Sequence, residues 1–277
     1  MDSGVRRHGL EHLRAKLPAL TRPRVELAVC AIFRDEARYL AEWVAFHRLM
    51  GVERFYLYDN DSADDWQRAL EGFSGVAVTP WPAHPGQFSA YADCLRRHRV
   101  DTRWIAFIDI DEFLFSPSGR QLPEVLCGFD GAAAVAVNWR CFGHGDWTER
   151  PPGLVTESYL WRARDDHAVN RHVKSIVKPR KVSTWIDNPH QFRHYAPVVG
   201  ENEDPVTSAF RDPPTADLLR INHYVLKSEA EFREKMSRRR ADIEASREGE
   251  RLPDEVRDET ILRYLPALRD ELSARRA

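Results

Sequence analysis

The sequence predicts an α/β protein built on a mostly parallel β-sheet with helices on both faces. Apolar, β-rich runs alternate with amphipathic helical patterns from residue 25 to residue 139. The run at 104–113 is apolar at positions that would face either side of a sheet, as is typical of a central parallel strand. With 277 residues, the chain is also long enough to bury a core without disulfides or metals.

The elements are expected in a regular order. After a polar leader at 1–24, the first strand is expected at Val25–Phe33. The helix that follows should end near Gly51 and share one face among Leu40, Trp43, Val44 and His47. The next expected elements are a strand at 53–61, a short helix at 63–73, a strand at 76–81, a helix at 87–99, a strand at 104–113 and a strand at 132–139.

The pattern changes beyond residue 150. Two strands are expected at 154–161 and 172–179 without a helix between them. The last fifty residues are helical and carry balanced charges of both signs, which is typical of solvated helices that pack on a sheet domain. We therefore divide the chain into a leader at 1–24, a sheet domain at 25–227 and a charged helical extension at 228–277.

Composition and charge exclude several classes of protein. Hydrophobic residues at 43% and charged residues at 30% exclude a disordered chain and a membrane bundle. The net charge of −2 gives no reason to expect a nucleic acid partner. The four cysteines form no CxxC pair, so we expect reduced, buried thiols. The sequence has neither a membrane-length apolar stretch nor the apolar core of a signal peptide, and we expect a cytoplasmic protein.

Two carboxylates interrupt the central apolar run. Asp109 and Asp111 would point to the same side of a continuing strand, about 6.6 Å apart. Such a pair repels unless a cation or donor lies nearby, and ligands of open α/β sheets bind beyond the carboxyl ends of the strands. Carboxylate oxygens suit Mg²⁺ or Mn²⁺, ions that usually keep positions for water and phosphate oxygens. The pair therefore predicts a divalent metal that holds a nucleoside diphosphate.

The Asp109 and Asp111 pair has other possible roles. The aspartates could instead cap the following turn or pair with arginine. Phosphatases of the haloacid dehalogenase type carry Asp-x-Asp on their first strand, whereas here it lies on the fourth, and acidic exonucleases use Asp-x-Glu. The sequence contains no GxxxxGK[ST] loop and no GxGxxG after the first strand, which disfavours a P-loop nucleotidase and a dinucleotide oxidoreductase.

Five motifs occur in a fixed order over about residues 27–240: CAIFRDEARYLAEWVAFHRLMGVERFYLYDNDSAD, WIAFIDIDEFLF, VNWRCFGHGD, KSIVKP and INHYVLKS. Together they resemble glycosyltransferase family 92 and the related bacterial family-2-like glycosyltransferases. The resemblance implies a GT-A fold, a nucleotide-sugar donor, a divalent metal (Mn²⁺ or Mg²⁺) and an inverting transfer. It also implies that Asp109 and Asp111 hold the metal, with His223 at the position that completes its shell. For His223 the alternative is a hydrogen-bonded core histidine.

The resemblance also implies which residues contact the nucleotide sugar. The family usually has Asn where this chain has Asp35 before Glu36, and Asp59 has the alternative role of a turn former. The lysines lie in the two KS-containing motifs, where a cation meets phosphate. The residues assigned to the donor are Asp35, Glu36, Asp59, Asn60, Asp109, Lys174, Lys178 and Lys227.

The expected reaction is transfer of a hexose from a nucleoside-diphosphate sugar, for which a UDP-sugar is favoured, to a hydroxyl of a glycan or lipid-linked acceptor. Inversion needs a general base, for which Glu157 is favoured over Asp146. The family suggests polysaccharide precursors as acceptors, in the cytoplasm or at the inner face of the membrane. The alternatives are a metal-dependent phosphodiesterase or nucleotidyltransferase, and a non-catalytic protein that binds nucleotide sugars.

Overall fold

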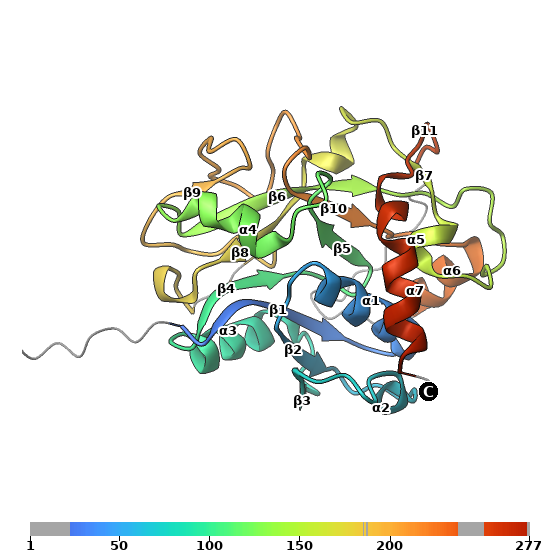
Figure 1. The fold of residues 1–277 in the computed structure, drawn as a ribbon, viewed down its shortest axis with the longest axis horizontal. Helices are drawn as coiled ribbons and strands as arrows, with labels where there is room; N and C mark the ends of the chain where they lie inside the picture. The colour runs from blue at the N-terminus through green and yellow to red at the C-terminus, as the bar shows by residue number, and fades with distance from the viewer. Residues whose placement is uncertain (1–22, 185, 187, 238–251, 276–277) are drawn as a thin grey trace, which may run out of the picture.

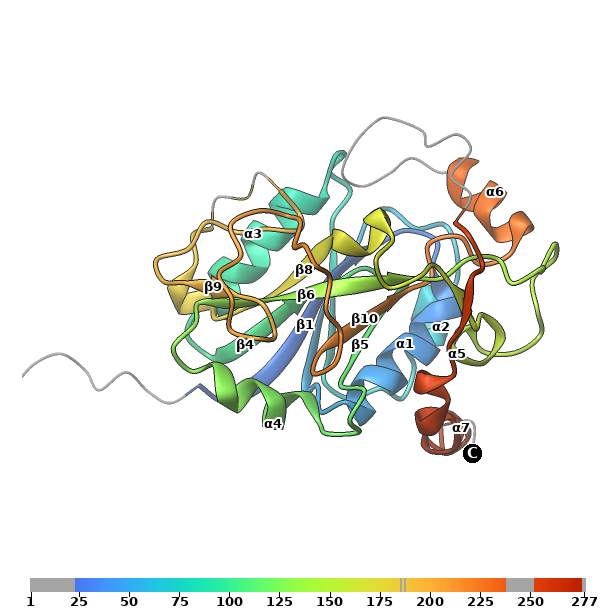
Figure 2. The ribbon, with the colours of Figure 1, turned by 90° about the horizontal axis from the view of Figure 1, so that it is seen from above.

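The computed structural model describes residues 23–184, 186, 188–237 and 252–275. Most of the expected leader and the segment 238–251 of the expected helical extension therefore lie outside the described residues. Within them, nine strands form one sheet with helices on both faces (Figures 1 and 2). The α/β class and the mostly parallel sheet expected from the sequence are confirmed.

The sheet has the strand order β3-β2-β1-β4-β8-β6-β10-β5, and β9 pairs with β6 outside this path. A second, two-stranded sheet pairs β7 with β11. The strands are β1 (Val25–Phe33), β2 (Arg54–Asp59), β3 (Val76–Pro80), β4 (Thr102–Phe107), β5 (Glu112–Phe115), β6 (Ala134–Cys141), β7 (Trp161–Arg162), β8 (Val173–Val177), β9 (Val198–Val199), β10 (Arg220–His223) and β11 (Val256–Arg257).

The helices divide between the two faces of the sheet. Alternate residues of β1 belong to different apolar clusters, which is the period of two that a strand buried on both faces requires. One cluster contains residues of α1, α4 and α7, and the other contains residues of α3. The helices are α1 (Ala37–Leu49), α2 (Trp66–Ala69), α3 (Gln87–His98), α4 (Leu122–Leu126), α5 (Val155–Ser158), α6 (Glu229–Ser237) and α7 (Leu265–Ser273).

Two expectations about the elements are wrong. The apolar run at 104–113 does not form one strand, because β4 ends at Phe107 and β5 begins only at Glu112. The segment 154–161 begins as helix α5 rather than as a strand. The Glu42 carboxylate accepts the backbone N–H groups of Val155 (2.8 Å) and Thr156 (2.9 Å), and so caps the first turn of α5. This long-range cap overrides the β-rich local sequence.

The carboxyl-terminal residues pack on the sheet domain. Leu268 of α7 and Ile261 are buried in the same apolar cluster as α1. The Tyr264 hydroxyl donates to the Ser116 carbonyl (2.8 Å). The residues before them are partly extended rather than helical, because β11 pairs with β7. The described part of this segment therefore completes the core.

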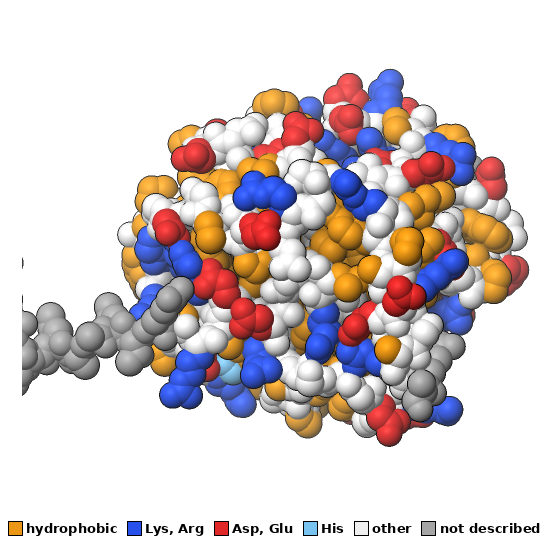
Figure 3. All heavy atoms as spheres, in the orientation of Figure 1, with side chains coloured by type: hydrophobic (Ala, Val, Ile, Leu, Met, Phe, Trp, Pro, Cys, Tyr) orange, Lys and Arg blue, Asp and Glu red, His pale blue; other side chains and the backbone are white. Residues whose placement is uncertain are grey.

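The remaining expectations concern the surface charges, the cysteine thiols and the lack of a membrane-spanning segment. On the face drawn in Figure 3, basic and acidic side chains are interspersed, which agrees with the small net charge. None of the four cysteines, all of which lie among the described residues, forms a disulfide, but Cys127 is exposed, contrary to expectation, while the other three are buried. Within the described ranges, none of the helices combines the length and apolarity that crossing a bilayer requires.

Acid should destabilise the protein through His47. Its ring is fully buried, donates from Nδ1 to the Trp43 carbonyl (2.8 Å) and accepts the Leu114 N–H at Nε2 (3.1 Å). Burial lowers the pKa of His47 to about 3. Because this value lies below the unfolded value of about 6.5, the stabilisation is present above pH 6.5 and is lost as the pH falls toward 3.

We expect acidification from pH 7 to pH 5 to cost about 2 kcal/mol through this histidine. His47→Gln should remove that part of the pH dependence, whatever it does to stability at pH 7. Urea unfolding of both proteins at the two pH values measures the difference. Equal losses of stability on acidification would contradict the prediction.

Candidate active site

The strand directions bring most of the expected site residues to one edge of the sheet. β1 pairs in parallel with β2 and β4, and β10 pairs in parallel with β6. Because β8 runs antiparallel to both β4 and β6, β6 runs in the same direction as β4. The carboxyl ends of these strands therefore meet, and the loops after them carry Asp35, Glu36, Asp59, Asn60, Asp109, Asp111 and Lys227.

Asp109 and Asp111 lie in the turn between β4 and β5, called the Asp turn below, and helix α1 holds this turn in place. Trp43 Nε1 donates to the backbone carbonyls of Asp109 (3.1 Å) and Glu112 (2.8 Å). The Glu112 carboxylate accepts the Asp109 N–H (3.0 Å), which folds the turn onto itself. Because they lie in a turn, the side chains of Asp109 and Asp111 do not follow the alternating directions of a strand. Their carboxylates have different partners.

Asp109 binds groups from α3 and β8. Its carboxylate accepts hydrogen bonds from Lys174 Nζ (2.8 Å) and Gln87 Nε2 (3.1 Å), and its side chain is 35% exposed. Burial acts to raise the pKa of Asp109, but Lys174 outweighs it and holds the pKa below its usual value. This carboxylate is therefore ionised and still partly accessible.

Asp111 faces groups from the carboxyl-terminal part of the chain. Lys235 Nζ lies 2.5 Å from Oδ2, and His223 Nε2 lies 3.6 Å from Oδ1. Burial acts to raise the pKa of Asp111, but Lys235 and His223 hold it well below its usual value. The neighbouring Lys227 is buried, with its ammonium 4.4 Å from the centre of the Tyr39 ring. Burial lowers the pKa of Lys227, against the opposing effect of Asp111.

A third carboxylate shares Lys174 with Asp109. Glu112 is fully buried, and its Oε1 lies 3.7 Å from Lys174 Nζ. Burial raises the pKa of Glu112 well above its usual value. The ammonium of Lys174, whose side chain is only 1% exposed, thus joins the start of β8 to both ends of the Asp turn. Its position indicates a dual role, in holding the turn and in presenting positive charge beside Asp109.

Aromatic and imidazole rings line the region next to His223. Trp139 on β6 lies 4.3 Å from His223, 4.8 Å from His172 and 5.3 Å from His190, measured between ring centres. Burial, followed by the charge of Lys174, lowers the pKa of His190 to about 3. His190 is therefore a neutral ring beside the charged turn.

The loops expected to contact the nucleoside are tied to one another. Asp35 Oδ1 accepts the Ala63 N–H (2.7 Å), and the Asp35 N–H donates to Ser62 Oγ (3.0 Å). Asp59 Oδ1 accepts the Ser62 N–H (3.0 Å). Asn60 Nδ2 donates to the carbonyls of Trp81 (2.7 Å) and Ala83 (2.8 Å). Asp35, Asp59 and Asn60 thus brace the loops after β1, β2 and β3. The negative charge of Glu36 acts to raise the pKa of both Lys227 and Lys235.

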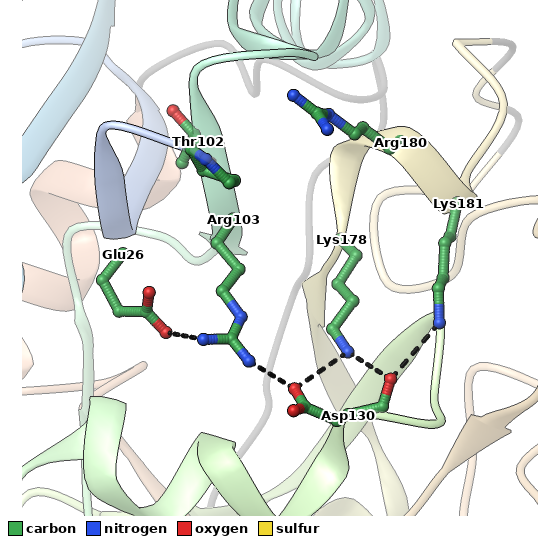
Figure 4. A pocket seen from close by; sticks show the side chains of 8 residues that line it. Glu26, Thr102, Arg103, Asp130, Lys178, Arg180 and Lys181 are labelled. Carbon is green, nitrogen blue, oxygen red and sulfur yellow. Dashed lines mark hydrogen bonds and ion pairs between the residues drawn. The ribbon is translucent and has the colours of Figure 1, made fainter. Parts of the chain in front are cut away.

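Lys178 is not brought to this site. It follows the end of β8, whereas Lys174 lies near the beginning of that strand, so the two lysines reach opposite edges of the sheet. Its ammonium donates to the carbonyls of Phe129 (3.2 Å) and Asp130 (2.6 Å) and lies 4.4 Å from the centre of the Trp104 ring. Lys178 lines a separate pocket of about 330 Å³. Figure 4 shows it there beside Arg103 and Asp130.

The two candidate bases have different surroundings. The Glu157 carboxylate accepts the Leu154 N–H (2.8 Å) and pairs with Arg269 of α7. Asp146 is exposed, with a φ of 64°, in the loop after β6. His144 of that loop donates from Nδ1 to the Lys227 carbonyl (2.7 Å), so the loop borders the site.

Sequence reasoning missed several residues of the site. Glu112 had a visible signal, because it is a third acidic residue directly after the Asp pair in an apolar run. Gln87 and Lys235 lie in helices whose patterns are ordinary, and neither gave a signal. Among the described residues no group of three metal-ligating side chains is preassembled. Asp111 and His223 form a facing pair of donors, which suits an ion that takes its remaining ligands from water and phosphate.

Comparisons with known proteins identify the family. The model of glycosyltransferase family 92 matches residues 24–258. A glycosyltransferase family 92 protein of Ricinus communis is 32% identical over 223 residues, which are 77% of this chain and 38% of that protein. A beta-1,4-galactosyltransferase of Caenorhabditis elegans is 22% identical over 218 residues, 73% of this chain and 48% of that protein. The chain thus spans less than half of either relative's length.

Solved structures show a weaker likeness. Glucosyl-3-phosphoglycerate synthase from Mycobacterium tuberculosis, solved with Mn²⁺, UDP and glucosyl-3-phosphoglycerate, matches with a TM-score of 0.31 at 20% identity. The match covers 44% of this chain and 45% of that one. The family model, in contrast, covers most of the sequence, including β1, the Asp turn and Asp258. The chain therefore belongs to glycosyltransferase family 92.

Proposed function

We propose that this protein transfers a hexose from a nucleoside-diphosphate sugar to a hydroxyl of a glycan or lipid-linked acceptor. The observation that carries the proposal is the pair of ionised carboxylates at the carboxyl edge of the sheet, surrounded by the ammonium groups of Lys174, Lys227 and Lys235. Membership of glycosyltransferase family 92 supports the same reaction.

The lysines suit the donor's diphosphate. Lys174 of β8 contacts Asp109, and Lys235 of α6 contacts Asp111. Charge-assisted hydrogen bonds from ammonium groups to phosphate oxygens are among the strong ones. The diphosphate would therefore lie between these groups, with the nucleoside directed toward the braced loops after β1 and β2.

A divalent ion fits the donor set of Asp111 and His223, with Asp109 nearby. When bound, Mn²⁺ or Mg²⁺ would neutralise charge on the departing diphosphate. The chain's own residues would orient that group: Lys174 holds the Asp turn, and Lys227 is kept in place over the Tyr39 ring. A neutral His223, favoured by burial, has a ring nitrogen available to donate a lone pair.

An inverting transfer would need a base to take the acceptor's proton. Asp146 is exposed in the loop whose His144 contacts the Lys227 carbonyl, whereas Glu157 is paired with Arg269. This favours Asp146 over Glu157, the reverse of the ranking expected from the sequence. Galactose is the first hexose to test, because one relative is named a beta-1,4-galactosyltransferase.

Incubation of the purified protein with a panel of UDP-sugars, Mn²⁺ and galacto-oligosaccharide acceptors tests the proposal. We expect release of UDP that depends on the metal and increases with an acceptor. Release of UMP would instead indicate a phosphodiesterase. Nucleotide binding without release of either product across the panel would indicate a non-catalytic binding protein.

A further inference from the structure

Helix α6 carries a lysine to the carboxylate of Asp111. Lys235 Nζ lies 2.5 Å from Asp111 Oδ2 and 3.3 Å from the Val225 carbonyl oxygen. The other carboxylate oxygen, Oδ1, faces His223 Nε2 at 3.6 Å. The Lys235 ammonium and the His223 ring therefore face different oxygens of the same Asp111 carboxylate.

A buried anchor one helical turn earlier fixes the position of α6. The carboxylate of Glu231 accepts hydrogen bonds from the hydroxyls of Tyr39 (2.5 Å), Tyr159 (2.5 Å) and Ser228 (2.6 Å). Glu231 is itself 6% exposed. Because Glu231 and Lys235 are four residues apart, they lie on the same face of the helix. The anchor thus directs Lys235 toward Asp111.

Given the function proposed above, we infer that Lys235 and the divalent metal compete for Asp111, and that the displaced lysine binds the diphosphate of the donor. The inference adds helix α6 to the donor site. It also gives Lys235 a role that neither the family motifs nor the sequence pattern assigns to it.

Competition follows from charge and geometry. An ion held by Asp111 and His223 would come close to the ammonium, and like charges at such a distance repel. Glu36, Asp109 and Lys227 also act on Lys235: the two carboxylates attract its ammonium, and Lys227 adds to the repulsion. The side chain of Lys235 is 40% exposed, and its four-carbon stem rotates freely enough to move the ammonium aside. A diphosphate bound to the ion would offer it a new anionic partner.

Two affinities should change in opposite directions in Lys235→Met. Without nucleotide, the variant should bind Mn²⁺ about threefold to tenfold more tightly, as expected for removal of a partly exposed competing ion pair. At saturating Mn²⁺, it should bind UDP about fivefold to tenfold more weakly, because one cation at the diphosphate is missing. Electron paramagnetic resonance of free Mn²⁺ measures the first affinity, and calorimetry with UDP measures the second.

Arg233→Met is the matched control. It removes one positive charge from the same helix at an exposed position, so both affinities should stay within twofold of the wild type. Lys235→Arg keeps the charge and should retain the weaker Mn²⁺ binding, which provides a folded comparison if Lys235→Met is unstable.

The outcomes separate this inference from the proposed function. Unchanged Mn²⁺ affinity in Lys235→Met would overturn the competition, and unchanged UDP affinity would overturn the contact with the diphosphate. Changes of equal size in Arg233→Met would show that any positive charge on α6 has this effect. That result would overturn both the competition for Asp111 and the contact with the diphosphate. A wild-type protein that binds neither Mn²⁺ nor UDP would instead overturn the metal-dependent function from which the inference starts.

Discussion

Asp111→Ala should abolish metal-dependent release of the nucleoside diphosphate while the protein stays folded. We expect a loss of at least about 10³-fold, because the variant lacks one of the two facing metal donors and several kcal/mol of leaving-group stabilisation depend on the ion. The measurement is UDP release with the active donor sugar at saturating Mn²⁺.

The fold should tolerate this substitution. Lys235 is partly exposed and can turn to solvent, and Lys227 keeps the nearby charge of Glu36 and its contact with the Tyr39 ring. The unfolding free energy should therefore fall by no more than about 2 kcal/mol. Asp166→Asn, at a side chain 81% exposed, is a control that should change neither activity nor stability. Full activity of Asp111→Ala would refute the role of this carboxylate.

The sequence predicted the parallel half of the sheet well because the strands and helices of that half follow from local sequence patterns. The strand Val25–Phe33 and the helix after it have the bounds and buried face that apolar periodicity indicates. In the structure that face includes Trp43 and His47, which hold the Asp turn and β5. The local pattern therefore predicted the buried face of this helix. It did not reveal that Trp43 and His47 hydrogen-bond to the Asp turn and to β5.

The remaining errors come from contacts between distant segments. The Asp turn leaves the strand because Trp43 and Glu112 hydrogen-bond its backbone, and no local pattern records a bond across 66 residues of sequence. Helix α5 forms because Glu42, 113 residues away, caps it. Lys235 reaches Asp111 across 124 residues. A charged helix is equally compatible with solvent exposure, so its sequence did not reveal this contact.

Lys174 and Lys178 show the same limit most clearly, because one motif contains both. Strand β8 runs opposite to its neighbours β4 and β6, so its beginning lies at the Asp turn and its end lies at the far edge. The resemblance assigned both lysines of KSIVKP to the donor. The strand's direction, which depends on the whole topology, decides which of them meets the donor.

Lys174→Met should therefore impair both the site and the fold. Removing the ammonium leaves Asp109 and the buried Glu112 without their shared partner, and breaking such a buried pair costs about 3 kcal/mol or more. UDP affinity at saturating Mn²⁺ should fall at least about tenfold, because a cation beside the diphosphate is lost. Urea unfolding and calorimetry with UDP measure the two effects.

Lys178→Met is the matched comparison on the same strand. It removes hydrogen bonds to two backbone carbonyls and the contact with the Trp104 ring, so stability should fall by about 1–3 kcal/mol. UDP affinity of the folded variant should nevertheless remain within about twofold of the wild type, because the lost ammonium lies at the opposite edge of the sheet. Similar losses of UDP affinity in the two variants would mean that the donor is not bound beside Lys174, since one ligand cannot contact both edges of the sheet.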